Sequence, residues 1–402
     1  MKKYLFTVLL LAAASLSIGQ SVRVSGYLFD TETNLPLESA NVYLAQTTMG
    51  SGSRPDGGFS FNAKSGKYQL VISHIGYQQV LKTVWLKRDT TINIAMQPEV
   101  RTLDELTIKE NPQNWEDNYA AFLRFFIGIT ENADMVTIEN PKEALYLYFD
   151  AEERALYASA RDELKVKNMA LGYQIYYDLK NFKMDYRTGY LKFYGIPRFE
   201  ELTPRSKRQQ KRWQKNRKKA YQGSLQHFFT SLRRDSLKAK QFEVVEVIRT
   251  PLNRNKALIN DKIKYFREKI MLENDGRLVL GKGRPLSDSL SYWINLKNTP
   301  DYTDSLGTPL YARDSLMSDS NTICCKPILR LEYLGEPESR NFIRDRRKED
   351  QGLNSQFSRL YFLQGQLSVF ENGYYDVDGL VLDGYLSWSE KLAEMLPLDY
   401  VP

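Results

Sequence analysis

The strongest chemical signal in the sequence is a run of cations between residues 205 and 219. Nine of these fifteen residues are basic, and no acid occurs from Leu202 to Arg234, although the whole chain has a net charge of only +7. At about 100° per residue, all but Arg217 fall on one broad helical face. That face consists of Arg205, Lys207, Arg208, Lys211, Arg212, Lys215, Lys218 and Lys219. Such a face suits an anionic surface or an acidic partner. The alternative is a solvent-exposed helix face whose positive charge is balanced by acidic residues elsewhere in the fold.

Other residue types that carry chemistry are few. His74 and His227 are the two histidines of the chain, and no H-x-x-E or H-E-x-x-H motif is present, which argues against a zinc peptidase. Cys324 and Cys325 are adjacent, a spacing that strains a disulfide and makes a poor zinc site. Phosphate-loop, dinucleotide and G-x-S-x-G motifs are also missing. We therefore expect no metal and no cofactor, and the balance favours a protein that is not an enzyme.

Three weaker patterns are interpreted as surface turns. They are the glycine-rich segments 50–53 and 281–285 and the aspartates Asp376, Asp378 and Asp383. No helix follows the first segment, which predicts a hairpin loop, and the second is predicted to be a turn at the end of a strand. The aspartates lack the spacing of a calcium loop. A carboxylate pair for glycoside hydrolysis depends on folded distance, so an envelope hydrolase with a site in residues 111–402 stays open as the alternative function.

The cations must be positioned by a helical stretch, predicted at residues 206–239. Gly223 divides this stretch, and Ser224 suits the N-cap of a second helix. His227 points away from the apolar stripe of that helix, so we expect it to be exposed. The stripe consists of Leu225, Phe228, Phe229 and Leu232.

The elements around this stretch predict an α+β domain with an antiparallel sheet. Asn111 and Pro112 suit the start of a first helix, whose apolar stripe from Trp115 to Ile127 is expected to be core. Residues 300–320 are predicted to be a long loop, and residues 388–395 a short last helix. Strands are predicted at 144–149, 155–160, 163–166, 172–178, 181–185, 190–194, 242–248, 265–271, 278–280, 328–334 and 366–370.

Residues 22–96 carry the pattern of a β-sandwich. Short strand-like runs alternate with turn sequences, and Tyr68, Leu70 and Ile72 share one face by the period of two. Strands are predicted at 22–29, 40–45, 59–61, 68–75, 79–85 and 91–96.

The order of the motifs in this region resembles the carboxypeptidase-regulatory-like domain. The motifs are Val24-Ser25-Gly26-Tyr27, Asp30, Pro36-Leu37, Ala40-Asn41-Val42, Asp56-Gly57-Gly58-Phe59-Ser60-Phe61, Gly66-Lys67-Tyr68 and Ser73-His74-Ile75-Gly76-Tyr77. The resemblance implies a seven-stranded, transthyretin-like (prealbumin-like) sandwich without an active site of its own. It also implies an exported Bacteroidetes protein, since such domains precede the plug of many TonB-dependent transporters. Arg54 departs from the pattern, because the family often has Asp near this turn.

Segments of the second domain resemble the second domain of Bacteroidetes proteins that carry the same sandwich. The segments are Phe125-Phe126-Ile127-Gly128, Leu171-Gly172-Tyr173, Tyr221-Gln222-Gly223-Ser224, Gly373-Tyr374-Tyr375-Asp376, Ser387-Trp388-Ser389 and Leu396-Pro397-Leu398-Asp399-Tyr400. This resemblance supports an envelope setting and implies no activity.

The first twenty residues predict export. Lys2 and Lys3 precede an almost wholly apolar run from Tyr4 to Ile18, and Gly19 suits a cleavage site. The run is shorter than the roughly 20 residues that span a bilayer. We therefore expect a signal peptide at 1–19, the sandwich at 20–98, a linker at 99–110 and the α+β domain at 111–402.

Composition and compartment together define the expected function. With 42% hydrophobic and 26% charged residues, the chain is globular and is neither disordered nor a polytopic membrane protein. Export makes nucleic acid an unsuitable ligand for the cations. We expect a non-enzymatic binding or interaction module of the periplasm or the outer-membrane periphery. The expected partners are a TonB-dependent transporter, another envelope protein, anionic lipid or lipopolysaccharide.

Overall fold

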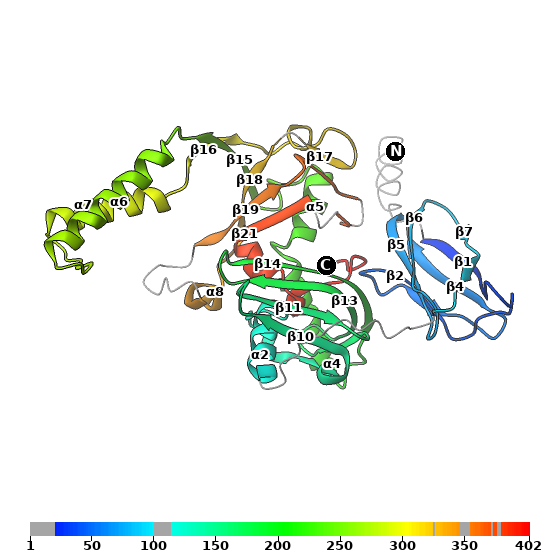
Figure 1. The fold of residues 1–402 in the computed structure, drawn as a ribbon. Coiled ribbons are helices and arrows are strands. Elements are labelled where there is room, and N and C mark those ends of the chain that lie inside the picture. Colours follow the sequence, from blue (N-terminus) through cyan, green and yellow to red (C-terminus); the bar gives the residue numbers. More distant parts are fainter. Residues whose placement is uncertain (1–20, 100–113, 325, 346–353, 371–372, 376–378) are drawn as a thin grey trace, which may run out of the picture.

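The computed structural model describes residues 21–99, 114–324, 326–345, 354–370, 373–375 and 379–402 (Figure 1). The predicted signal peptide and nearly all of the predicted linker lie outside these residues, as do Asn111, Pro112, Cys325, Asp376 and Asp378. The described chain is mostly β-sheet, with several antiparallel sheets and a smaller number of helices. None of the described helices is long and apolar enough to cross a membrane.

The N-terminal region forms two four-stranded sheets around one core. The first contains β4 (Gly58–Lys64), β1 (Ser21–Asp30), β7 (Thr90–Thr91) and β8 (Ile94–Met96). The second contains β3 (Gly50–Gly52), β2 (Asn41–Leu44), β5 (Gly66–Ser73) and β6 (Val80–Leu86). Tyr68, Leu70 and Ile72 are all buried between the sheets, which confirms their shared face.

Two features of this region differ from expectation. Eight strands form instead of seven, because β7 and β8 pair one after the other with β1 and are separated by Ile92 and Asn93. Residues 50–52 are a strand paired with β2 and not the predicted hairpin loop, since the turn lies earlier, between Leu44 and Gly50.

The middle of the chain forms a six-stranded antiparallel sheet. Its strands are β9 (Val136–Ile138), β10 (Leu145–Asp150), β11 (Ala155–Ala160), β12 (Leu164–Asn168), β13 (Tyr173–Asp185) and β14 (Tyr190–Glu201). The predicted strands at 172–178 and 181–185 are therefore one long strand. β12 pairs with the first half of β13, and β11 pairs with the second half. β14 pairs with the whole length of β13, so the strand order of the sheet does not follow the chain order. Helix α2 (Trp115–Phe126) packs on it through Phe122 and Phe126, which confirms that stripe as core.

A five-stranded sheet follows in the order β16-β15-β18-β19-β21. Its strands are β15 (Phe242–Pro251), β16 (Tyr302–Pro309), β18 (Ile328–Pro337), β19 (Ser355–Phe362) and β21 (Leu380–Gly384), and β17 (Thr322–Cys324) pairs with β20 (Gln366–Ser368) beside it. Helices α4 (Lys207–Tyr221) and α5 (Leu225–Arg233) are divided at Gly223, as predicted, and the Ser224 side chain accepts the His227 N–H. The apolar stripe of α5 is buried in the core of this sheet. The remaining short helices include α3 (Pro141–Ala144), α8 (Arg340–Asp345), α9 (Tyr385–Ser389) and a 3-10 turn at Leu392–Glu394.

Several predictions between residues 256 and 320 were wrong. The predicted strand at 265–271 lies inside helix α6 (Lys256–Glu273), and residues 278–280 form no strand. Segment 281–285 leads into helix α7 (Pro285–Asn298), with Pro285 as its first residue, and does not end a strand. The predicted loop at 300–320 contains β16. Figure 1 shows α6 and α7 as a helical hairpin that projects from the rest of the molecule.

The sandwich contacts the six-stranded sheet through the turn between β2 and β3 (Figure 1). The Gln46 N–H donates to the Pro197 carbonyl at 2.7 Å, and the Phe199 N–H donates to the Thr47 carbonyl at 3.0 Å. Tyr43 on β2 packs in a small buried cluster with Ile196 on β14. Backbone hydrogen bonds and apolar burial therefore both hold the sandwich against the sheet.

Candidate functional site

Helix α4, which carries the predicted basic face, is anchored through its opposite side. Trp213 is buried, and its indole N–H donates to the Met169 carbonyl at 2.8 Å. Gly172 has a φ of +75°, and a Cβ at this position would lie 2.3 Å from the Trp213 ring. Glycine is thus needed both for the turn and for the close approach of the indole. These contacts hold the helix against the loop between β12 and β13.

Arg217, the cation that the helical period places off the face, is used to attach the helix. Its guanidinium donates to the backbone carbonyls of Leu171 at 2.7 Å and Gly172 at 3.1 Å, and to Glu201 at 3.0 Å. The same group lies 4.0 Å from the centre of the Tyr173 ring. Satisfied donors and a stacked aromatic ring make this arginine a structural residue.

The other eight cations are brought together on the solvent side of α4 and the residues that precede it. Arg205, Lys207, Arg208, Lys211, Arg212, Lys215, Lys218 and Lys219 are all exposed. Within the described part of the chain, none of the eight makes an ion pair with an acid. Because like charges one turn apart repel by a few tenths of a kcal/mol per pair, this face keeps an electrostatic cost that no neighbouring acid removes by direct contact.

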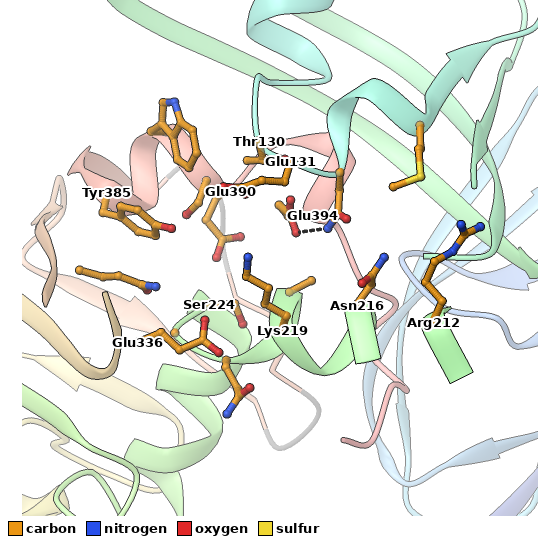
Figure 2. A pocket seen from close by; sticks show the side chains of 18 residues that line it. Thr130, Glu131, Arg212, Asn216, Lys219, Ser224, Glu336, Tyr385, Glu390 and Glu394 are labelled. Atoms are coloured by element: carbon orange, nitrogen blue, oxygen red, sulfur yellow. Dashed lines mark hydrogen bonds between the residues drawn. The ribbon is translucent and has the colours of Figure 1, made fainter. Parts of the chain in front are cut away.

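A cavity of about 340 Å³ lies beside the C-terminal half of α4 (Figure 2). Arg212 and Lys219 reach it from the helix, and Glu336 lies in its wall at the end of β18. Glu390 and Glu394 follow α9 and line the opposite wall. In Figure 2 the Lys219 side chain extends from α4 toward the carboxylates. The positive charge of Lys219 acts on both Glu336 and Glu394.

The pKa values of Glu336, Glu390 and Glu394 are shifted in the same direction. Burial raises the pKa of Glu390 to about 6 and also raises the pKa values of Glu336 and Glu394. Glu390 accepts the Leu225 N–H at 2.7 Å, and Glu394 accepts from the Asn132 side chain at 2.8 Å. A hydrolase that uses a general acid beside an ionised carboxylate needs pKa values pushed apart. Glu336, Glu390 and Glu394 shift in the same direction, but Glu131 is a fourth carboxylate in the cavity wall, so an envelope hydrolase stays the alternative function.

Sequence reasoning missed this cavity because its parts come from distant segments. Glu390 and Glu394 are four residues apart, but Glu336 and Lys219 reach the same space from separate elements. The spacing of Glu390 and Glu394 is a signal for proximity alone, and three other acid pairs have the same spacing, at 139/143, 332/336 and 345/349.

His227 is the clearest correction among the candidate residues. The sequence predicted exposure, but the side chain is only 7% exposed. Its Nδ1 accepts the Gly223 N–H at 3.1 Å, and its ring packs against Phe242 and Tyr333. The prediction failed because β15 and β18 cover α5 beyond the apolar stripe.

The remaining candidates are dispersed. His74 follows β5 and hydrogen bonds to the Glu38 carbonyl at 3.0 Å. Cys324 lies at the end of β17, and the Asp383 carboxylate in β21 lies 3.9 Å from the Arg359 guanidinium. In the residues that the structure describes, no group of three or more His, Cys, Asp and Glu side chains is arranged to hold a metal ion.

Comparison with solved structures gives matches of low overall similarity. A DUF3823 family protein from Parabacteroides merdae is 14% identical and covers 46% of this chain and 81% of its own, with a TM-score of 0.18. A putative membrane-associated protein of unknown function from Bacteroides fragilis is 11% identical and covers 91% of this chain and 95% of its own, with a TM-score of 0.16. A cohesin–X-dockerin complex from Acetivibrio cellulolyticus covers 19% of this chain at 23% identity, and 56% of its own chain is matched, with a TM-score of 0.17. TM-scores this low support no conclusion about the whole chain.

Comparison at the sequence level is more informative for the N-terminal region. The TonB-dependent receptor SusC of Bacteroides thetaiotaomicron is 33% identical over 115 residues, which is 27% of this chain but only 11% of the receptor. Residues 24–108 match the family model of the CarboxypepD_reg-like domain. The resemblance that the motifs indicated is therefore confirmed, and the chain carries a CarboxypepD_reg-like domain in this region.

Proposed function

We propose that this chain is an exported, non-enzymatic cell-envelope protein that acts as an interaction module at an anionic surface. The CarboxypepD_reg-like domain and the similarity to a TonB-dependent receptor support the envelope setting. The charged and apolar pattern of residues 1–19 supports export, with a mature chain that begins near Gln20. A TonB-dependent transporter is the partner that this setting suggests.

The observation that carries the proposal is the basic face of α4. Its eight cations are exposed and lack ion-pair partners among the described acids, and Trp213 and Arg217 fix the helix that presents them. Attraction to an anionic membrane surface contributes about 1 kcal/mol per basic residue near it. Lipid A phosphates and anionic lipid headgroups offer this chemistry in an envelope. The repulsion within the face is relieved when such anions bind.

The test is binding to vesicles with and without anionic lipid or lipopolysaccharide at low salt. The structure favours reversing Lys207, Arg208, Lys211 and Lys215 to Glu, because all four are exposed and none lines the acidic cavity. If these four contact the surface, loss of their attraction amounts to about 4 kcal/mol, or about a thousandfold in affinity. Circular dichroism should show that the variant keeps the parent's fold.

A matched control changes the charge equally at another helix. Lys262, Lys264, Arg267 and Lys269 on α6 are also exposed, and their reversal to Glu gives the same change in net charge. The control should bind anionic vesicles far better than the α4 variant. Equal binding by the parent and the α4 variant would refute the proposal, as would an equal loss in the two variants.

A further inference from the structure

A second and larger cavity lies between the six-stranded and five-stranded sheets. Its volume of about 570 Å³ is in the range of small-molecule sites, roughly 300–1,000 Å³. Much of its wall is apolar or aromatic and comes from β13, β14, β21 and the segment after α9. Tyr190, Tyr194 and Leu363 also line it, although they are 44%, 37% and 62% exposed. Large apolar side chains thus meet solvent at this cavity and offer surface that a ligand can cover.

Lys391 brings a positive charge to this apolar wall. Its aliphatic stem packs on Gly128, where φ is +96° and an added Cβ would lie 2.9 Å from the Lys391 Cβ. Its ammonium lies 5.9 Å from the centre of the Phe193 ring. No described residue forms a hydrogen bond or an ion pair with this ammonium. Burial lowers the pKa of Lys391 to about 8, so at pH 7 most of the lysine is charged but poorly solvated.

The other charged groups in the wall do not complete an ion pair with Lys391. Arg124 is already hydrogen bonded to Asp345. Glu390 also lines the cavity and attracts the lysine, but its carboxylate receives no hydrogen bond from the Lys391 ammonium and accepts the Leu225 N–H at 2.7 Å. A half-buried charge without a direct partner is unfavourable, and a complementary anion relieves that cost.

We propose that this cavity binds a small amphipathic anion, an apolar chain that ends in one carboxylate or phosphate group. The chain packs against the aromatic and aliphatic wall, where Phe193 and Leu380 lie. The anionic head receives a hydrogen bond from the Lys391 ammonium. None of the eight cations of the basic face lines this cavity.

Calorimetry with four ten-carbon amphiphiles tests the proposed chemistry at pH 7, below their micelle concentrations. Decanoate and decyl phosphate carry the required anion, decanol has the same tail without a charge, and decyltrimethylammonium reverses the charge. We expect saturable binding of at least one of the two anions, with clearly weaker binding of decanol and of the cation. A lysophospholipid arm shows whether a lipid headgroup is accepted as well as a free acid. Absence of binding by both anions, or equal binding of decanol, would overturn the proposal.

Substitution of Lys391 assigns the site. Lys391→Met removes the charge while keeping an unbranched side chain, and it should weaken anion binding about tenfold to a hundredfold, as expected for a hydrogen bond to a charged group. Lys391→Arg should retain most of the affinity. Lys82→Met is the control, because Lys82 is exposed on β6 of the sandwich and does not line the cavity. Parent-like affinity in Lys391→Met would contradict the assignment.

Chemical labelling tests the site in the parent protein, without any substitution. An amine-reactive acylating reagent at pH 8 should label Lys391, and decanoate or decyl phosphate, whichever binds, should protect it from labelling. Labelling of Lys82 in the same sample should not change. If a saturating anion leaves the labelling rate of Lys391 unchanged, the anion does not bind against this lysine and the proposal fails.

Discussion

Acid should weaken the fold through His227, and His227→Gln should remove that sensitivity. The ring is buried, and its Nδ1 accepts the Gly223 N–H, which requires this nitrogen to be unprotonated. Burial lowers the pKa of His227 from its ordinary 6.5 to about 4. As the pH falls below 6.5, the unfolded chain binds a proton that the native protein does not bind until about pH 4. The free energy of unfolding must therefore decrease across this window.

The size of the effect follows from the shift in pKa. One unit corresponds to about 1.36 kcal/mol, so a shift from 6.5 to about 4 sets an upper limit near 3 kcal/mol. We expect about 2 kcal/mol, because partial solvent screening reduces the full value. Glu390 has the opposite sign: its pKa is raised to about 6, so its burial destabilises the fold at neutral pH and this penalty is relieved by acid.

Urea unfolding of the parent and of His227→Gln at several values between pH 7.5 and pH 4 measures the effect. The variant should be less stable at pH 7.5, since it loses buried packing, and the difference should shrink by about 2 kcal/mol toward pH 4. The free energy of unfolding of the parent relative to Glu390→Gln should instead increase toward pH 4, because protonation of Glu390 relieves its burial penalty in the parent alone. A parent–His227→Gln difference that does not depend on pH would refute the reasoning.

Three further predictions concern packing. The Tyr43 hydroxyl is buried without a hydrogen-bond partner in the described structure, so Tyr43→Phe should raise the free energy of unfolding by about 1 kcal/mol, whereas Tyr43→Ala should lower it by about 3–5 kcal/mol in urea titrations. Trp213→Ala should cost about 3–5 kcal/mol and increase hydrogen exchange in α4, and unchanged exchange would show that the indole does not anchor the helix. Fragment 20–98 should fold alone as a β-rich domain by circular dichroism, because its core lies between its own two sheets; a fragment that folds only with residues 111–402 would contradict the predicted boundary.

Local patterns in the sequence were sufficient to predict much of the fold. The period of two on Tyr68, Leu70 and Ile72 depends on strand geometry alone, and these side chains are buried as expected. Gly223 and Ser224 divided two helices by turn and capping chemistry, which also acts locally. The cations of α4 are exposed as expected because the helical period placed Trp213 on the opposite side.

Competing local signals explain the main secondary-structure error. The tyrosine and phenylalanine at 265–266 favoured a strand, but Ile259, Ile263 and Ile270 recur at helical spacing. These isoleucines form a small core with Leu290 of α7. Burial of this helical stripe outweighs the β-propensity of the aromatic residues.

Long-range packing explains what the sequence could not show. The burial of His227 depends on Phe242 and Tyr333, which come from two later strands. The site around Lys391 likewise needs Gly128 and Phe193, far away along the chain. No local periodicity reports such juxtapositions, so both cavities appear only in the folded chain.

A salt titration of vesicle binding by the parent protein tests the central claim most directly. If the basic face of α4 binds an anionic surface, binding should be strong at low salt and should be lost near 1 M salt, where the screening length is about 3 Å. Vesicles of purely zwitterionic lipid should bind little of the protein at any salt concentration. Binding that persists at high salt, or that is equal on zwitterionic vesicles, would contradict the claim that the unpaired cations of α4 carry the interaction.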